Sequence, residues 1–500
     1  MRTFDTKLII FLASLCLACV TLSASAGADA LDEAAFRNPP PEAGIRCFWW
    51  WLNSNVTKEA ITRDLEEMKA KGFSGALIFD SDGSSQRGNR RVPAGPVFAS
   101  PDWTELFVHA CREAKRLGLE LSLNLQSGWN LGGPRVTAEE ATQRLVWSKT
   151  TLQGPATVEQ ALPTPQHRDF YRDVVVLAVP LPADATMRPI ENLRFKSATR
   201  ELGMSAPDCR FLLETSPAKP GELAVKSQDI CNISAKMDAS GTLRWDVPEG
   251  EWVILRMGHT ATGAHVSTHS AGWGGRVLDY MNPDALHAYW ERNIGPLIEA
   301  IGPMAGTTLH YAHTDSWEGG GMNWTPGFDR AFRESRGYDP LPWLAVLAGY
   351  VVDSREASNA FLADFRKTIG DRVADHYGLL AELAGKHGMG THPECSGPHA
   401  GPLDGLKNYG RSELMMSEFW SPSPHRPRPD NRFFVKQASS AAHTYGKRLV
   451  GAEGFTTIGP HWNDIPWAHM KPSFDTEFCA GLNLLFVHTT TVSFRQVCVT

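Results

Sequence analysis

The chain has 500 residues, which is enough for one (β/α)₈ barrel of about 250 residues and one or two further modules. Its 42% hydrophobic and 21% charged residues are typical of a soluble globular protein, and a net charge of −6 gives no electrostatic reason to expect nucleic acid or an anionic membrane as partner. The 16 Trp residues offer large aromatic faces, which suit the C–H-rich faces of sugar rings as well as core packing.

The first residues have the pattern of an export signal. Basic residues precede an apolar run from Leu8 to Leu22, and Ala24-Ser25-Ala26 suits signal-peptidase cleavage. The run is too short for a membrane span, and nothing downstream offers about 20 consecutive apolar residues. We therefore expect residues 1–26 to be a signal peptide and the mature chain to be periplasmic or extracellular. A lipid anchor at Cys19 is the alternative.

After the signal, short apolar runs that end in polar or glycine residues alternate with helical patterns, which is typical of a parallel α/β fold. We expect eight strands, at residues 47–53, 75–80, 119–126, 308–312, 389–391, 413–416, 448–450 and 482–487. Helical patterns cover about 57–72, 103–118, 284–301 and 359–386. Between about 148 and 268 the alternation breaks into Pro-rich loops and strand-like pieces at 173–179, 243–247 and 252–257, with a turn expected at 248–250.

These patterns predict an α/β protein with a (β/α)₈ TIM barrel and a β-rich domain inserted after the third strand. The barrel would be formed by residues 38–147, with strands one to three, and 269–500, with strands four to eight. Residues 148–268 would form the inserted domain, and their position after a strand end places this domain on the catalytic face of the barrel.

Four glutamates, Glu318, Glu394, Glu418 and Glu453, follow four successive predicted strands. In a barrel such positions point at one cavity, because the strands are parallel and their C-terminal ends meet on one face. Glycoside hydrolysis needs one carboxyl group that is protonated and one that is ionised, so two of the four suffice. The surplus carboxylates repel one another, and their oxygens suit a Ca²⁺ ion, which could also bind sugar hydroxyls.

Other polar and aromatic residues near the predicted strand ends could form a sugar subsite. The expected substrate-binding residues are Trp50, Asn53, Asp80, Trp129, Asp315, Trp317, His392, Trp420 and His488. His461 and Trp462 lie near the same predicted edge. An alternative interpretation combines His313, His392 and Glu394 as a transition-metal site with nitrogen and oxygen ligands.

Several ordered motifs resemble glycoside hydrolase family 106, the α-L-rhamnosidases. They are Phe48-Trp49-Trp50-Trp51-Leu52-Asn53-Ser54-Asn55-Val56-Thr57, Asp315-Ser316-Trp317-Glu318, Asn323-Trp324-Thr325-Pro326-Gly327-Phe328, Arg336-Gly337-Tyr338-Asp339-Pro340 and Gly451-Ala452-Glu453. The resemblance implies a calcium-assisted, inverting exo-hydrolase that removes terminal α-L-rhamnose from polysaccharides or glycosides. It also implies that Glu318 is the general acid and Glu453 the general base, while Glu418 and Glu394 bind calcium or position water.

Family members usually continue for several hundred residues with a closing helix and β-sandwich modules. The expectation from the resemblance is therefore a truncated chain that lacks the last barrel helix and these modules. Two alternatives to the rhamnosidase remain at this stage. One is a hydrolase of another sugar on the same barrel, and the other is an inactive carbohydrate-binding relic.

Overall fold

The computed structural model describes residues 33–85, 90–181, 188–202, 209–395, 403–420, 433–456 and 470–491. The predicted signal peptide, His461 and Trp462 lie outside these residues. Two units are separated at Gly44: the first contains the short helices α2 (Glu33–Arg37) and η1 (Pro41–Ala43), and the second begins at Ile45. Within the described residues, no helix is both long enough and apolar enough to cross a membrane.

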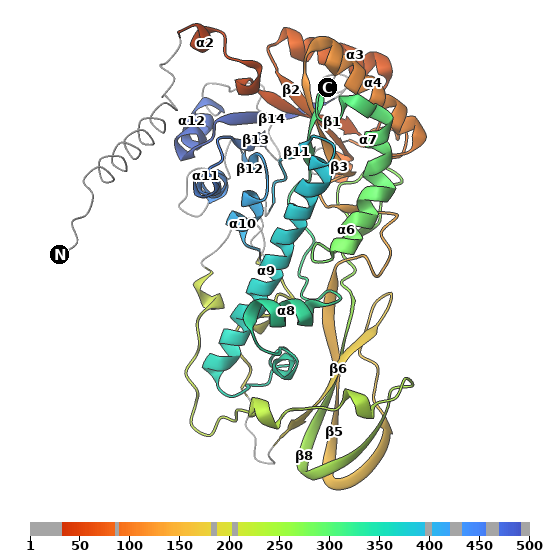
Figure 1. Ribbon diagram of the computed structural model, residues 1–500, viewed down its shortest axis with the longest axis vertical. Helices are drawn as coiled ribbons and strands as arrows, with labels where there is room; N and C mark the ends of the chain where they lie inside the picture. The colour runs from red at the N-terminus through yellow and green to blue at the C-terminus, as the bar shows by residue number, and fades with distance from the viewer. Residues whose placement is uncertain are drawn as a thin grey trace, which may run out of the picture. The chain divides into compact units, whose positions relative to one another are not determined.

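Eight parallel strands form one curled sheet in the second unit (Figure 1). They are β1 (Arg46–Leu52), β2 (Gly75–Ser81), β3 (Glu120–Ser127), β10 (Leu309–His313), β11 (Gly390–Thr391), β12 (Met415–Trp420), β13 (Val450–Thr456) and β14 (Leu484–Thr491). Their order is β11-β10-β3-β2-β1-β14-β13-β12, so β11 and β12 are the two edges. The predicted α/β class and the eight parallel strands are confirmed.

The two edge strands come together without forming a β-ladder in the described residues. The carbonyl oxygen of Thr391, in β11, accepts hydrogen bonds from the backbone N–H groups of Glu413 and Leu414, just before β12. The circular order of the strands therefore matches that of a (β/α)₈ barrel, and in the described part of the chain two backbone bonds span the last junction.

Side chains on both faces of the parallel strands are buried, which explains the nearly continuous apolar runs in the sequence. Alternate residues of β1 separate into two clusters: Phe48 and Trp50 face the inside of the curl, whereas Trp49 and Trp51 pack in the outer core. The inner cluster is completed by Leu77, Phe79, Leu414, Met416, Leu484 and Phe486. These side chains fill the curl of the sheet below the C-terminal ends of the strands.

The helices expected from the sequence are present and begin and end at recognisable caps. Helix α3 (Lys58–Ala70) starts after Thr57, whose hydroxyl accepts from the N–H of Ala60, and α4 (Pro101–Leu117) starts after Ser100, which accepts from Trp103. The longest helix is α9 (Arg355–Gly385). Helices α6 (Pro283–Tyr289) and α7 (Gly295–Ile301) are joined by a π-helical turn. The other α-helices of this unit among the described residues are α5 (Leu193–Lys196), α8 (Phe328–Arg336), α10 (Gly405–Gly410), α11 (Phe433–Tyr445) and α12 (Lys471–Ala480).

A second sheet lies in sequence between β3 and β10. It is antiparallel, with the order β5-β8-β6-β7, and consists of β5 (Gln143–Ala161), β8 (Thr242–Ala261), β6 (Arg172–Pro180) and β7 (Cys231–Asn232). β-structure was expected here, although β5 begins before the predicted start at residue 148. The sheet and the parallel strands belong to the same compact unit, and the division into domains at 147 and 268 stays a prediction.

The predicted turn at residues 248–250 is wrong. The two strands expected at 243–247 and 252–257 are parts of the single strand β8. Pro248 lies where the pairing with β5 shifts, between the pairs Gly154–Gly250 and Ala156–Val247. A bulge of this kind accommodates a proline, which cannot donate a hydrogen bond to the neighbouring strand.

Residues 262–275, the return segment, lead from β8 back to the ends of the parallel strands. The carbonyl oxygens of Ser267 and Thr268 accept hydrogen bonds from the backbone N–H groups of Trp129 (3.3 Å) and Asp82 (2.8 Å). The N–H of Ser270 donates to Ser127 Oγ at 2.8 Å. The return segment is therefore fixed against the loops that follow β2 and β3.

We predict that Asp279, which follows the return segment, makes the protein less stable as pH rises from about 4 to about 7. Its side chain is completely buried and accepts hydrogen bonds from Met281 N and Thr325 Oγ1, but burial raises its pKa from 3.8 to about 7. Because the folded state holds this proton more tightly than the unfolded state does, the stabilisation is complete below pH 4 and disappears as pH rises through 7.

The substitution Asp279→Asn should remove this part of the pH dependence, because an amide does not ionise. The free energy of unfolding, measured by urea denaturation between pH 4 and pH 8, should show the change. The variant Thr325→Ser retains the hydroxyl donor and should keep the wild-type slope. Parallel curves for wild type and Asp279→Asn would contradict the assignment.

Candidate functional site

Five carboxyl groups gather at the C-terminal ends of the parallel strands. Glu418 and Glu453 face each other as register partners in β12 and β13. Asp315 and Glu318 lie on the segment that follows β10, and Glu394 lies just beyond β11. The strands were predicted to end before Glu418 and Glu453, which is wrong: both residues lie inside strands that continue to Trp420 and Thr456.

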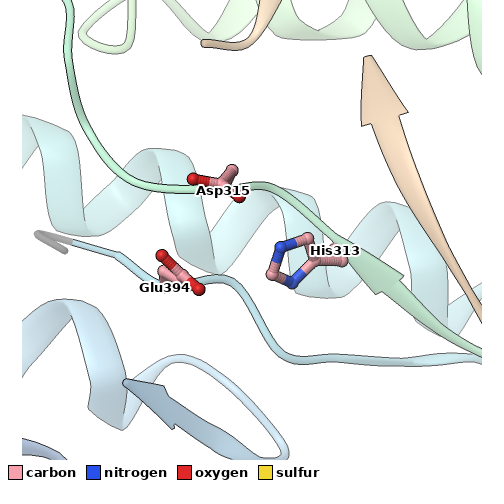
Figure 2. A group of neighbouring side chains, drawn as sticks. All are labelled: His313, Asp315 and Glu394. Carbon is pink, nitrogen blue, oxygen red and sulfur yellow. The ribbon is translucent and has the colours of Figure 1, made fainter. Parts of the chain in front are cut away.

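The closest contacts form two overlapping groups. Ligand atoms of His313, Asp315 and Glu394 lie within 4.8 Å of one another, as do those of Glu394, Glu418 and Glu453. Figure 2 shows the first group: His313 at the end of β10, Asp315 on the chain beyond it, and Glu394 on the neighbouring segment after β11. Glu394 belongs to both groups and links them.

Burial and mutual repulsion disfavour the ionised forms of these carboxyl groups. The pKa of Asp315 is raised well above its usual value by burial and then by the charges of Glu453 and Glu318. The pKa of Glu394 is raised in the same way by burial and by Asp315, Glu453 and Glu418. Burial and the charge of Glu453 also raise the pKa of Glu418, although the indole of Trp420 donates a hydrogen bond to it at 3.0 Å.

The second group has the properties of a site for a hard cation. Both oxygens of Glu394 are buried without a hydrogen-bond partner. Among the described residues, no Lys or Arg forms an ion pair with Glu394, Glu418 or Glu453. Oxygen ligands at this spacing and with this negative charge fit Ca²⁺, and binding of the ion would offset both the repulsion and the lack of partners for Glu394.

Glu318 is more accessible than the other four and contacts two hydroxyl groups. Its Oε2 lies 3.3 Å from Ser267 Oγ in the return segment, and its Oε1 lies 3.3 Å from Ser316 Oγ. Asp315 Oδ1 in turn accepts hydrogen bonds from the N–H and the hydroxyl of Ser316. The carboxyl group of Glu318 is therefore contacted at both oxygens while remaining partly exposed.

Aromatic rings form a wall beside these carboxyl groups. The ring of Trp50 lies 5.5 Å from that of Trp129 and 5.0 Å from that of His488, measured between centroids. The Nε1 atom of Trp50 is buried without a partner, and His488 Nε2 lies 3.8 Å from Glu453 Oε1. Burial lowers the pKa of His488, whereas the charge of Glu453 acts in the opposite direction. The wall thus combines apolar faces with an indole donor and an imidazole.

Two of the predicted substrate-binding residues are bonded to the framework. Asn53 donates to the carbonyl of Val92 at 2.7 Å and accepts from the N–H of Ala271 at 2.8 Å. Asp80 accepts from Ser54 Oγ at 2.5 Å and from Trp103 Nε1 at 3.1 Å, and burial raises its pKa. Their contacts hold the strand ends, the loop before α4 and the return segment together.

Two further predicted residues are also buried away from solvent. Trp317 packs edge-on against Tyr280 at 4.7 Å between ring centroids. His392 lies inside the curl, where its Nε2 is 2.7 Å from Ser122 Oγ and its Nδ1 is 3.0 Å from His313 Nδ1. The other predicted residues, namely Trp50, Trp129, Asp315, Trp420 and His488, lie at or beside the carboxyl groups.

The sequence interpretation did not include Ser267 and Asn130 among the site residues. Ser267 donates both its backbone N–H, at 3.1 Å, and its hydroxyl, at 2.8 Å, to Asn130 Oδ1. Asn130 directly follows Trp129, one of the expected substrate-binding residues. No signal in the sequence marked Ser267, because it lies in a loop and meets Asn130 only through the fold.

Comparisons with known proteins agree with this arrangement. A family profile described as alpha-L-rhamnosidase matches residues 37–494. A curated protein of Formosa agariphila, named "Putative beta-glucuronidase", is 39% identical over 461 residues, which cover 91% of this chain and 38% of that protein. The solved structure of a rhamnosidase from Novosphingobium sp. PP1Y superposes with a TM-score of 0.81 at 25% identity, covering 92% of this chain and 56% of that one. The chain therefore spans less than two thirds of either relative.

Proposed function

Because the chain belongs to glycoside hydrolase family 106, the α-L-rhamnosidases, we propose that it removes terminal α-L-rhamnose from a polysaccharide or glycoside. The observation that carries this proposal is the group of five carboxyl groups beside an aromatic wall at the strand ends. Such a site can protonate a leaving oxygen, activate a water molecule and stack against a sugar ring. The signal-like residues 1–26 support export to the periplasm or the extracellular space.

In the proposed mechanism Glu318 is the general acid and Glu453 is the general base. Glu318 is the more accessible of the two and belongs to neither of the tight groups, which suits a residue that meets the leaving group. Glu453 lies deeper, between Glu418 and His488, where it could deprotonate a water molecule on the opposite face of the sugar. An inverting pair of this kind leaves about 6.5–9.5 Å between the carboxyl groups for that water.

The aromatic wall fits the remaining part of a bound sugar ring. The ring of Trp129 is partly exposed and packs beside that of Trp50, so it can lie against the C–H groups of a sugar. A 6-deoxy sugar such as rhamnose carries a methyl group that suits an apolar contact. The wall therefore supports a neutral, partly apolar monosaccharide as the bound unit.

We further propose that Glu394 and Glu418 hold a Ca²⁺ ion. The support is the unpartnered, buried carboxyl group of Glu394 within 4.8 Å of two other carboxyl groups. Bound calcium would supply positive charge and free coordination positions for two sugar hydroxyls. The residues of this chain would then position the ring, with Glu318 and Glu453 left for proton transfer.

We predict that calcium raises the melting temperature of the chain by about 2 °C or more at saturating concentration, because a ligand that binds only the folded state stabilises it. Glu394→Gln and Glu418→Gln should lose this shift, since each removes an ionised ligand. Differential scanning fluorimetry with calcium, zinc and chelator measures it.

Glu413→Gln is the matched control, because Glu413 is exposed just before β12 and pairs with Lys447. It should retain the calcium shift. A wild-type chain that is stabilised by zinc and not by calcium would overturn the calcium proposal in favour of a ligand set containing His313.

The rhamnosidase proposal predicts release of nitrophenol from nitrophenyl α-L-rhamnopyranoside. Glu318→Gln and Glu453→Gln should each lower kcat by about 10²–10⁴, the usual contribution of a general acid or base. Glu413→Gln should retain the wild-type rate. Proton NMR of the first product should show β-rhamnose, the inverted anomer, whereas α-rhamnose would contradict the inverting mechanism.

A second candidate activity comes from the name of the curated relative, a β-glucuronidase. A glucuronide carries a carboxylate, and a site for it usually supplies an Arg or Lys partner. Among the described residues no Lys or Arg forms an ion pair with Asp315, Glu394 or Glu418, which favours a neutral sugar.

A panel of nitrophenyl glycosides separates the candidates. We predict that the α-L-rhamnoside is hydrolysed at least about tenfold faster, by kcat/KM, than the β-glucuronide, the β-galactoside or the α-fucoside, a difference of about 1.4 kcal/mol in transition-state binding. Preferential hydrolysis of another member would identify the sugar. Binding of rhamnose-containing glycan without release of any sugar would instead indicate a non-catalytic binding protein.

A further inference from the structure

The return segment places a hydroxyl group on the residue proposed as the general acid. Ser267 Oγ lies 3.3 Å from Glu318 Oε2 and 2.8 Å from Asn130 Oδ1. These three residues come from different parts of the chain: Asn130 follows β3, Ser267 follows the antiparallel sheet, and Glu318 follows β10. The contact to Glu318 is thus made by a segment outside the eight parallel strands.

The Ser267 hydroxyl donates its hydrogen to Asn130 Oδ1. A serine hydroxyl carries a single hydrogen, and Asn130 Oδ1 is the closer of its two neighbours by 0.5 Å, from 2.8 and 3.3 Å. The orientation of the Asn130 amide is fixed independently, because the backbone N–H of Ser267 also needs Oδ1 as its acceptor. Towards Glu318, Ser267 therefore presents a lone pair, which can only accept a hydrogen bond.

From this geometry we propose that Ser267 is a positioning residue for the general acid, accepting a hydrogen bond from the protonated carboxyl group of Glu318. This inference rests on the proposed role of Glu318. A hydroxyl oxygen that acts only as an acceptor can form a hydrogen bond with a carboxylic acid, but it cannot form one with a carboxylate. When substrate binds, the glycosidic oxygen replaces Ser267 as the acceptor of this proton, and the long distance of 3.3 Å suits such an exchange.

The backbone of the return segment makes Ser267 a rigid partner. The carbonyl of Thr268 and the N–H groups of Ser270 and Ala271 are bonded to Asp82, Ser127 and Asn53. Ser267 itself is held at its N–H, its carbonyl oxygen and its hydroxyl. The Oγ atom therefore has little freedom to follow Glu318, so it offers the acid a partner in a fixed place.

The experiment compares aryl glycosides with good and poor leaving groups. A poor leaving group such as phenol needs protonation by the acid, whereas dinitrophenol leaves without it. Ser267→Ala should lower kcat/KM for the phenyl glycoside about five- to tenfold, because without this hydrogen bond a smaller share of the free enzyme holds the carboxyl group protonated and in place for the leaving oxygen. It should change kcat/KM for the dinitrophenyl glycoside less than about twofold. Ser267→Thr retains the hydroxyl and should restore the phenyl glycoside rate.

Two reference variants make the result specific. Ser270 belongs to the same segment, and its buried hydroxyl has no hydrogen-bond partner among the described residues, so any loss of activity in Ser270→Ala should be equal for both substrates. Glu318→Gln reports on the acid itself. The comparison uses whichever aryl glycoside the wild type hydrolyses, so it does not depend on the identity of the sugar.

A leaving-group-dependent loss in Glu318→Gln with an equal loss for both substrates in Ser267→Ala would overturn the role of Ser267 alone. Equal losses for both substrates in Glu318→Gln would overturn the acid assignment, and the role of Ser267 with it. Leaving-group dependence in both variants, with recovery in Ser267→Thr, supports the proposal.

Discussion

Repulsion among buried carboxyl groups is the constraint on which this site depends. Glu418 and Glu453 are direct neighbours across two parallel strands, an arrangement that is unfavourable for two like charges. The strands keep this register because the apolar cluster inside the curl, with Met416 and Phe486, lies immediately below the carboxyl groups. A one-residue shift of β12 would move Met416 to the other face, so the apolar core keeps Glu418 in its register opposite Glu453.

The site is not built by the parallel sheet alone. The chain leaves the sheet after β3, forms the antiparallel sheet and comes back through residues 262–275, which contact the loops after β2 and β3. Asn53 and Asp80 hold these elements together with hydrogen bonds that are buried from water. Polar residues at the strand ends therefore have two roles: some, such as Asn53 and Asp80, join elements of the fold, and others form the candidate site.

The sequence was sufficient to predict the α/β class, the eight parallel strands and helices α3, α4 and α9, because each has a clear apolar period or a cap. It was not sufficient to distinguish, at the strand ends, side chains that line the candidate site from side chains that pack inside the protein. His392 and Trp317 were expected at a sugar subsite because they are polar or aromatic near a strand end, and their role in substrate binding stays a prediction. The sequence did not reveal that His392 would contact Ser122 and Trp317 would pack on Tyr280. Ser267 was missed because its contacts with Asn130 and Glu318 span 137 and 51 positions, and no local pattern records such contacts.

The hydrogen bonds of the two histidines also bear on the kind of cation that the site can hold. Nδ1 of His313 donates to the carbonyl of His392, and both ring nitrogens of His392 have neighbours within 3.0 Å. A site combining His313, His392 and Glu394 could therefore use only Nε2 of His313 as a nitrogen ligand, since His392 is occupied. Two buried carboxyl groups, Asp315 and Glu394, lie close to His313, and Glu394 is shared with the group that contains Glu418 and Glu453. A set so rich in oxygen ligands favours a hard cation over a transition metal.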